Sequence, residues 1–243
     1  MTDRTIEAVI FDWGGTLSRW AQLDLIDVWR LAARRLDPDR EDEIAAHLLG
    51  IEDAAWAETQ TTQRSWTLAQ VLERASDDLG LDVNEVVLEE AALHHIDAWT
   101  PHIEHKPDAA ATLEALRERG LRIGLLSNTM WPRPFHRHFL ERDGLLHLID
   151  AEVYSSEIEV TKPHPAAFAA AQAAVGVTDP ARAVFVGDRP FDDIHGARAV
   201  GMRTVYLPTS DVPGYDVEPD AVIDSLSELP PVIDAWSRGE DLR

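Results

Sequence analysis

Hydrophobic residues along the chain follow two periodicities, which predict two kinds of element. Short apolar runs, typical of buried strands, recur at residues 8–11, 121–126, 151–154, 183–186 and 204–207, with a weaker one at 221–223. Helical spacing fills gaps between the later runs, at residues 108–119, 165–175 and 192–200, and each of these segments ends at a glycine. Strands that alternate with helices predict an α/β fold, with a Rossmann-like parallel sheet covered by helices on both faces.

A long interval with no strand pattern separates the first apolar run from the second. Within it, apolar residues recur three or four positions apart in four segments, at residues 23–36, 41–58, 67–79 and 84–98. This predicts an inserted α-helical bundle over residues 19–103 and a core made of residues 1–18 and 104–243. Because the insert follows the first strand directly, we expect a helical cap that closes over a site at the sheet edge and excludes water.

Composition narrows the classes of function. The chain has 44 acidic and 22 basic residues, a formal net charge of −22, which argues against partners such as nucleic acid or an anionic membrane surface. It has no cysteine, so disulfides, thiolate chemistry and cysteine–zinc sites are excluded. The sequence shows neither a signal peptide nor an apolar stretch of ~18 residues, so we expect a cytoplasmic protein, and no pattern indicates its oligomeric state.

The residues after the first apolar run carry the most specific signal in the chain. Asp12 follows the buried strand directly, and Gly14 and Gly15 come next. Open α/β sheets build their sites at the carboxyl ends of strands, and glycines let backbone N–H groups approach an anion closely. A carboxylate in this place is a candidate nucleophile of the kind that forms an aspartyl phosphate.

Weaker polar signals follow later in the chain. Ser127 and Asn128 come after the second apolar run, where a hydroxyl or an amide could hold a phosphate oxygen. Lys162, which precedes a proline, is one of only two lysines; the other is Lys106. Each of these residues taken alone is typical of an ordinary turn or surface position. They indicate a functional site only through their order along the chain.

A cluster of carboxylates follows the fourth apolar run. Asp188, Asp192 and Asp193 lie close together in the chain and would repel one another unless a cation lay among them. Oxygen ligands of this kind suit Mg²⁺, which prefers one or two carboxylates together with water and substrate phosphate. The pattern therefore predicts Mg²⁺ as the cofactor.

The order of these motifs resembles that of the haloacid dehalogenase-like hydrolase superfamily. A nucleophilic aspartate, a serine, Lys-Pro and Gly-Asp-x-x-x-Asp-Asp succeed one another as the superfamily's four motifs do, over residues 8–18 and 106–207. The helical insert is similar to the superfamily's cap between the first and second motifs. The resemblance implies an Mg²⁺-dependent hydrolase, a phosphatase whose substrate is a small phosphorylated molecule.

The resemblance also implies roles by position. Asp12 would attack the substrate, and Lys162 would neutralise charge beside it. The substrate-binding group would comprise Gly14, Thr16, Ser127 and Asn128, with the Ser127 hydroxyl on the phosphoryl group. The metal ligands would be Asp12, the backbone carbonyl of Gly14 and Asp188, with Asp193, or alternatively Asp192, in support.

The first motif departs from the phosphatase pattern of the superfamily at one position. Most phosphatases of this kind carry a second aspartate two residues after the nucleophile, where it protonates the leaving group, and here that residue is Gly14. Loss of a general acid costs about 10²–10⁴ in rate. A phosphatase would then need a good leaving group, such as that of an acyl phosphate, or a proton from His164, His195 or the insert.

Three other interpretations remain open. A 2-haloacid dehalogenase also lacks the second aspartate, since halide needs no proton, but it has no need of a carboxylate cluster for a metal. A phosphonatase has a small residue at the same place but uses a cap lysine as a Schiff base, and this insert has no lysine. The last of the three is a catalytically weak phosphate-binding or regulatory protein.

The charge of the insert limits the substrate. With eighteen acidic and seven basic residues, the insert would repel a highly phosphorylated substrate.

Overall fold

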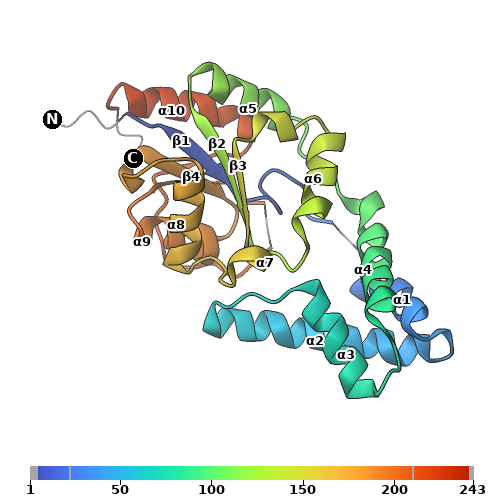
Figure 1. Cartoon of the computed structure of the whole chain (residues 1–243). Helices are drawn as coiled ribbons and strands as arrows, with labels where there is room; N and C mark the ends of the chain where they lie inside the picture. Colours follow the sequence, from blue (N-terminus) through green and yellow to red (C-terminus); the bar gives the residue numbers. More distant parts are fainter. Residues whose placement is uncertain (1–4, 22, 210, 241–243) are drawn as a thin grey trace.

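The protein is described by a computed structural model that covers residues 5–21, 23–209 and 211–240. One parallel sheet has the strand order β3-β2-β1-β4-β5-β6 (Figure 1). The strands are β1 (Ala8–Phe11), β2 (Arg122–Ser127), β3 (Ala151–Tyr154), β4 (Ala183–Gly187), β5 (Arg203–Tyr206) and β6 (Ala221–Val222). Each predicted apolar run forms a strand with bounds within one residue of those expected, and the α/β fold is confirmed.

Helices cover both faces of the sheet, which explains why the central strands are apolar throughout. Val9 and Phe11 of β1 belong to the cluster on one face, and Ala8 and Ile10 belong to the cluster on the other. The first face is covered by α5 (Ala109–Glu118), α6 (Arg133–Arg142) and α10 (Leu229–Ser237). The second is covered by α8 (Pro165–Ala174) and α9 (Gly196–Ala199), and α7 (Ser155–Ile158) follows β3.

The helical insert also forms as the spacing predicts. Its helices are α1 (Leu25–Leu36), α2 (Glu41–Thr62), α3 (Leu68–Leu79) and α4 (Glu85–Trp99). Thr67 and Gln70 make a capping box at the start of α3, and the side chain of Asn84 caps α4. Buried residues of these helices, among them Trp29 and Leu48, form an apolar cluster separate from the two clusters that flank the sheet.

The chain passes between core and insert twice, and the two crossings are paired with each other by backbone hydrogen bonds. Where the chain leaves and re-enters the core, the Arg19 N–H donates to the Glu104 carbonyl and the Lys106 N–H donates to the Leu17 carbonyl. The loop between α2 and α3 also reaches the core, because the Thr161 N–H donates to the Gln63 carbonyl at 2.9 Å. In Figure 1 the insert lies toward the carboxyl ends of the strands. None of the helices among the described residues has the length and apolarity that a membrane crossing needs.

Strand order places the site. The chain fills the sheet on one side of β1 with β2 and β3, then returns to place β4 on the other side of β1. Such a reversal opens a crevice outside the carboxyl ends of the two strands that flank it. Asp12 follows β1 and Asp188 follows β4, so residues 176 positions apart meet at this switch point.

Candidate active site

The turn after β1 brings Asp12 and the two glycines to the switch point. The Asp12 N–H donates to the Val186 carbonyl of β4 at 2.9 Å, and its side chain is buried. Gly15 has φ +85°, and a Cβ there would lie 2.2 Å from Oδ2 of Asp188. Position 15 therefore requires glycine for two reasons: its backbone is left-handed, and a side chain would collide with Asp188.

Lys162 lies at the centre of the site. Its buried Nζ donates to Oδ1 of Asp12 at 2.5 Å and to Oδ1 of Asp193 at 2.7 Å. Asn128 fixes the backbone beneath it, since its amide accepts from the Lys162 N–H at 2.7 Å and donates to the Lys162 carbonyl at 3.0 Å. The contacts of Asn128 are thus those of a residue that positions the lysine.

Three buried carboxylates cluster in the site, and two of them, Asp12 and Asp193, contact this lysine. Ligand atoms of Asp12, Asp188 and Asp193 all lie within 4.8 Å of one another. The second oxygen of Asp193 accepts from the Arg189 N–H at 2.9 Å. Asp192 lies outside this group and has its carboxylate 3.4 Å from the guanidinium of Arg189. The geometry favours Asp193 over Asp192 as the acidic residue that supports the centre.

The site has more negative than positive charge. Burial raises the pKa of Asp12 to about 7, and Lys162 opposes that shift while Asp193 and Asp188 add to it. Burial by itself would lower the pKa of Lys162, but the charges of Asp12 and Asp193 raise it overall. Lys162 therefore stays protonated, and a single ammonium is shared among buried carboxylates that still repel one another.

These residues fit a hard divalent cation. Carboxylate oxygens crowded within 4.8 Å and incompletely neutralised by Lys162 match the oxygen-only ligand set of Mg²⁺. Asp188 offers buried oxygens on one side, and the turn at Gly15 can approach that carboxylate closely because residue 15 has no side chain. The cluster is the arrangement expected of a site prepared for Mg²⁺.

Two further predicted residues lie at this edge of the sheet. Thr16 is buried and its hydroxyl donates to Oδ1 of Asp188 at 3.3 Å. Ser127 is buried at the end of β2, and its hydroxyl makes no hydrogen bond with any residue of the described ranges. A buried hydroxyl without a protein partner has its donor and acceptor available for a ligand.

The structure adds two residues for which the sequence predicted no contact in the site. The Trp20 indole N–H donates to Oδ2 of Asp188 at 3.0 Å, and the Arg189 guanidinium lies 5.0 Å from the centre of the Trp20 ring. The proximity of Trp20 to Asp12 in the chain was the available signal, whereas its contact with Asp188 spans 168 residues.

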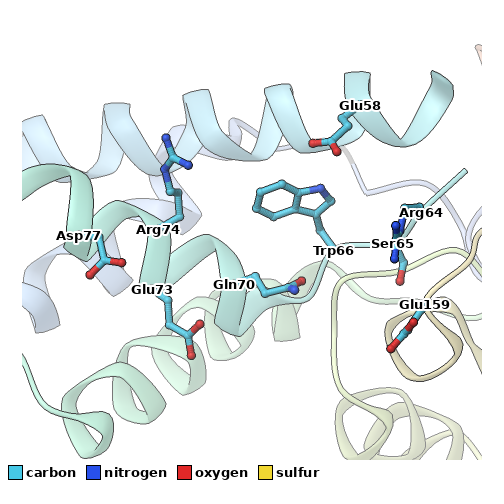
Figure 2. Close-up of a pocket in the computed structure, with 9 residues that line it drawn as sticks. All are labelled: Glu58, Arg64, Ser65, Trp66, Gln70, Glu73, Arg74, Asp77 and Glu159. Atoms are coloured by element: carbon cyan, nitrogen blue, oxygen red, sulfur yellow. The ribbon is translucent and has the colours of Figure 1, made fainter. Parts of the chain in front are cut away.

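A cavity of about 600 Å³ lies elsewhere, on the insert between α2 and α3 (Figure 2). Trp66 points into it, with Glu58 of α2 above and Gln70 of α3 below, and Glu159 of the core at one end. Its lining contains none of the three clustered carboxylates and not Lys162. The cavity is therefore separate from the carboxylate site.

Comparison with known proteins agrees with the fold and the motif order. The sequence profile of the haloacid dehalogenase-like hydrolases matches residues 6–201. A Mycobacterium tuberculosis protein named as a phosphatase is 31% identical over 237 residues, which cover 95% of this chain and 98% of that protein. Glyceraldehyde 3-phosphate phosphatase of Methanopyrus kandleri is 31% identical over 163 residues, or 62% of this chain and 69% of the enzyme.

Solved structures with this fold include hydrolases of two kinds. A 2-haloacid dehalogenase of Pseudomonas syringae superposes with a TM-score of 0.72 at 27% identity, over 95% of this chain and 99% of the other. A phosphatase of Thermococcus onnurineus superposes with a TM-score of 0.62 at 26% identity, over 98% and 100%. The chain spans about half the length of the phosphoserine and phosphoglycolate phosphatases that it also matches.

Proposed function

The chain belongs to the haloacid dehalogenase-like hydrolase family, and we propose that it is an Mg²⁺-dependent phosphatase of a small organophosphate. The observation that carries the proposal is the contact of Lys162 with both Asp12 and Asp193, beside Asp188. This arrangement gives a buried nucleophile, a fixed positive charge and an oxygen-rich metal site in one crevice. The relatives named as phosphatases support the same activity.

In this proposal Asp12 attacks the phosphoryl group and forms an aspartyl phosphate. Lys162 occupies Oδ1 of Asp12, and no group in the described ranges hydrogen-bonds to Oδ2, which is therefore the attacking oxygen. Each pair of like charges brought to 4 Å costs about 4 kcal/mol at an effective dielectric constant near 20, so attack on a phosphate needs cationic support. Lys162 supplies part of that support and keeps the nucleophile in place.

The metal would be held by Asp12, the Gly14 carbonyl and Asp188, with Asp193 in support. Bound there, Mg²⁺ would offset the negative charge of the phosphoryl oxygens. Asp193 also accepts hydrogen bonds from Lys162 and from the Arg189 N–H, and so fixes the lysine relative to the turn. Thr16 and Trp20 orient Asp188, and the Ser127 hydroxyl is placed to donate to a phosphoryl oxygen.

The insert would act as the cap of this site. The division proposed is residues 1–18 and 104–243 for the hydrolase core and residues 19–103 for the cap. The insert has its own apolar cluster, and the two chain segments that connect it to the core are hydrogen-bonded to each other. Both features support movement of the insert as one unit. The backbone contact from Gln63 to Thr161 lies next to Lys162, so closure of the cap and placement of the lysine would be linked.

A dehalogenase is the second candidate, and one observation favours it. Position 14 carries no acid, as expected when the leaving group is a halide, and a 2-haloacid dehalogenase shares the fold at 27% identity. The three-carboxylate cluster argues the other way, because halide displacement by Asp12 gains nothing from a cation site. The two activities differ in product and in their need for metal.

The test is a hydrolysis panel of alkyl, aryl and acyl phosphates and 2-haloacids, each with Mg²⁺ and with a chelator. We expect phosphate release that requires Mg²⁺ and falls at least 10⁴-fold in Asp12→Asn, while Asp192→Asn serves as a control at the same edge of the sheet. Halide release without metal, and no phosphate release, would replace the phosphatase with the dehalogenase.

A further inference from the structure

The place of the absent acid at position 14 is partly occupied by Trp20. A Cβ on Gly14 would lie 3.7 Å from Cη2 and 3.9 Å from Cζ3 of the Trp20 ring. The indole cannot donate a proton to a leaving group at any ordinary pH, and its N–H is already directed to Asp188. A proton donor for a phosphatase reaction must therefore come from another part of the crevice.

The two histidines that the sequence suggested as donors have other contacts. The Nδ1 atom of His164 accepts from the Ala166 N–H at 3.1 Å, which makes this residue the N-terminal cap of α8. His195 stacks on Phe191, with ring centres 5.5 Å apart, and Tyr215 packs against both of these rings. Neither contact directs an imidazole toward Asp12.

Lys106 has the properties that the histidines lack. Its Nζ is buried and has no hydrogen-bond partner among the described residues. Its backbone is fixed to the turn of the first motif, since the Lys106 N–H donates to the Leu17 carbonyl at 2.8 Å and the neighbouring His105 pairs with Ser18. Buried polar groups in folded proteins are almost always paired, so an unpaired ammonium beside the site calls for a ligand.

The charges around Lys106 connect it to the reaction centre. Its charged neighbours are Asp188, Asp108 and Asp12, which favour the protonated form, and Arg19, which disfavours it. Burial outweighs the carboxylates and lowers the pKa of Lys106. A lysine with a lowered pKa gives up its proton more readily and can serve as an acid and then as a base.

We propose that Lys106 is the general acid and base of this site, in place of the carboxylate missing at position 14; the assignment rests on the proposed phosphatase function. As Asp12 forms its bond to phosphorus, the bond from phosphorus to the leaving oxygen breaks, and the Lys106 ammonium gives that oxygen its proton. The neutral amine then takes a proton from the water that attacks the aspartyl phosphate. Inorganic phosphate leaves, and the ammonium and the Asp12 carboxylate are restored.

The test is kcat/KM across phosphate monoesters of graded leaving-group pKa, for wild type, Lys106→Met, Lys106→Arg and Arg19→Met. We expect Lys106→Met to lose about 10²–10⁴-fold on alkyl phosphates and only a few-fold on 4-nitrophenyl phosphate, whose leaving group departs without a proton. Lys106→Arg should show the same steepened series, because arginine keeps the charge but does not release its proton. Arg19→Met, a control for the local charge, should leave the slope unchanged.

Two outcomes would overturn the assignment. Equal loss by Lys106→Met on every ester would indicate a charge or folding role, and an alkyl phosphate rate retained in Lys106→Arg would show that charge alone suffices. Mg²⁺ calorimetry and thermal unfolding of both variants separate these effects from a damaged site. Absence of phosphate hydrolysis in the wild type would instead defeat the proposed function itself, and the assignment with it.

Discussion

The insert and the active edge of the core both contain many charges, but they place them in opposite environments. In the insert, Arg30 and Asp42 pair at 3.2 Å with side chains that are 41% and 87% exposed. In the core, Lys162 and Asp193 pair at 2.7 Å with side chains that are 2% and 0% exposed. An exposed pair contributes little to stability, whereas breaking a buried one leaves a charge without compensation.

The difference explains what each region does with its acidic residues. Most carboxylates of the insert are solvated and serve solubility and local helix contacts, so these should tolerate replacement. The carboxylates of Asp12, Asp188 and Asp193 are desolvated and crowded, and burial together with the charges of Asp193 and Asp188 raises the pKa of Asp12. Crowding of this kind is destabilising without a cation, which is why it marks a site.

The two regions also have separate apolar interiors. Leu48 of α2 and Leu113 of α5 are both fully buried, but they belong to different clusters. Met130 and Trp131 of the core are the residues that reach into the cluster of the insert. The stability of the insert and the chemistry of the core should therefore respond to different substitutions.

The largest expected difference between the two regions is in stability, and Leu48→Ala tests it. Loss of a fully buried leucine should lower the free energy of unfolding by about 2–5 kcal/mol, but Mg²⁺ affinity should stay within a few-fold of wild type. Urea unfolding and calorimetry measure the two quantities, and Leu113→Ala is the matched core variant with a similar loss of stability. If Leu48→Ala abolished Mg²⁺ binding, the apolar packing of the insert would be required to hold the metal site.

A smaller effect concerns two buried histidines, one in each region. Burial lowers the pKa of His95 in α4 and of His136 in α6 to about 3. A base with a lowered pKa is protonated first in the unfolded chain, so stability is full above pH 6.5 and falls as the pH decreases toward 3. At pH 5 each histidine should cost about 2 kcal/mol relative to pH 8.

The measurement is urea unfolding at pH 8 and pH 5 for wild type, His95→Leu and His136→Leu. Each variant should lose about 2 kcal/mol less than wild type between the two pH values. A His95 variant with the wild-type pH dependence would mean that the insert opens enough to hydrate this ring, which is packed 3.9 Å from the centre of Trp29.

The smallest effect tests the contact between the two regions. Trp20 lies in the connection to the insert and donates to Asp188, so Trp20→Phe should lower Mg²⁺ affinity about tenfold while it keeps the ring near Arg189. Calorimetry without substrate measures this change. Trp56→Phe, a substitution within the insert, is the control, and equal affinities for both variants would show that Trp20 does not orient Asp188.

The sequence predicted much of this molecule because local patterns were strong. Apolar runs as short as residues 8–11 favour a buried strand over a helix because of their length, and the glycines after Asp12 and before Asp188 mark the turns that follow the strands. Helices α6 and α10 were not predicted. Only Phe135, His136, Phe139 and Leu140 of α6 are buried, and in α10 two prolines near the start obscure the helical spacing.

The strand order and the contacts across it were decided by the tertiary structure. From residue types and their order alone, the chain specified a parallel sheet, a helical insert after the first strand and the identity of the acidic and basic residues at the strand ends. Which residues touch was not specified, because the switch point joins β1 to β4 and brings Asp12, Lys162 and Asp193 within hydrogen-bond distance. The sequence also did not specify that the amine of Lys106 is buried without a partner, or that Trp20 donates to Asp188. Both features depend on segments that are distant in the chain and meet only in the packed molecule.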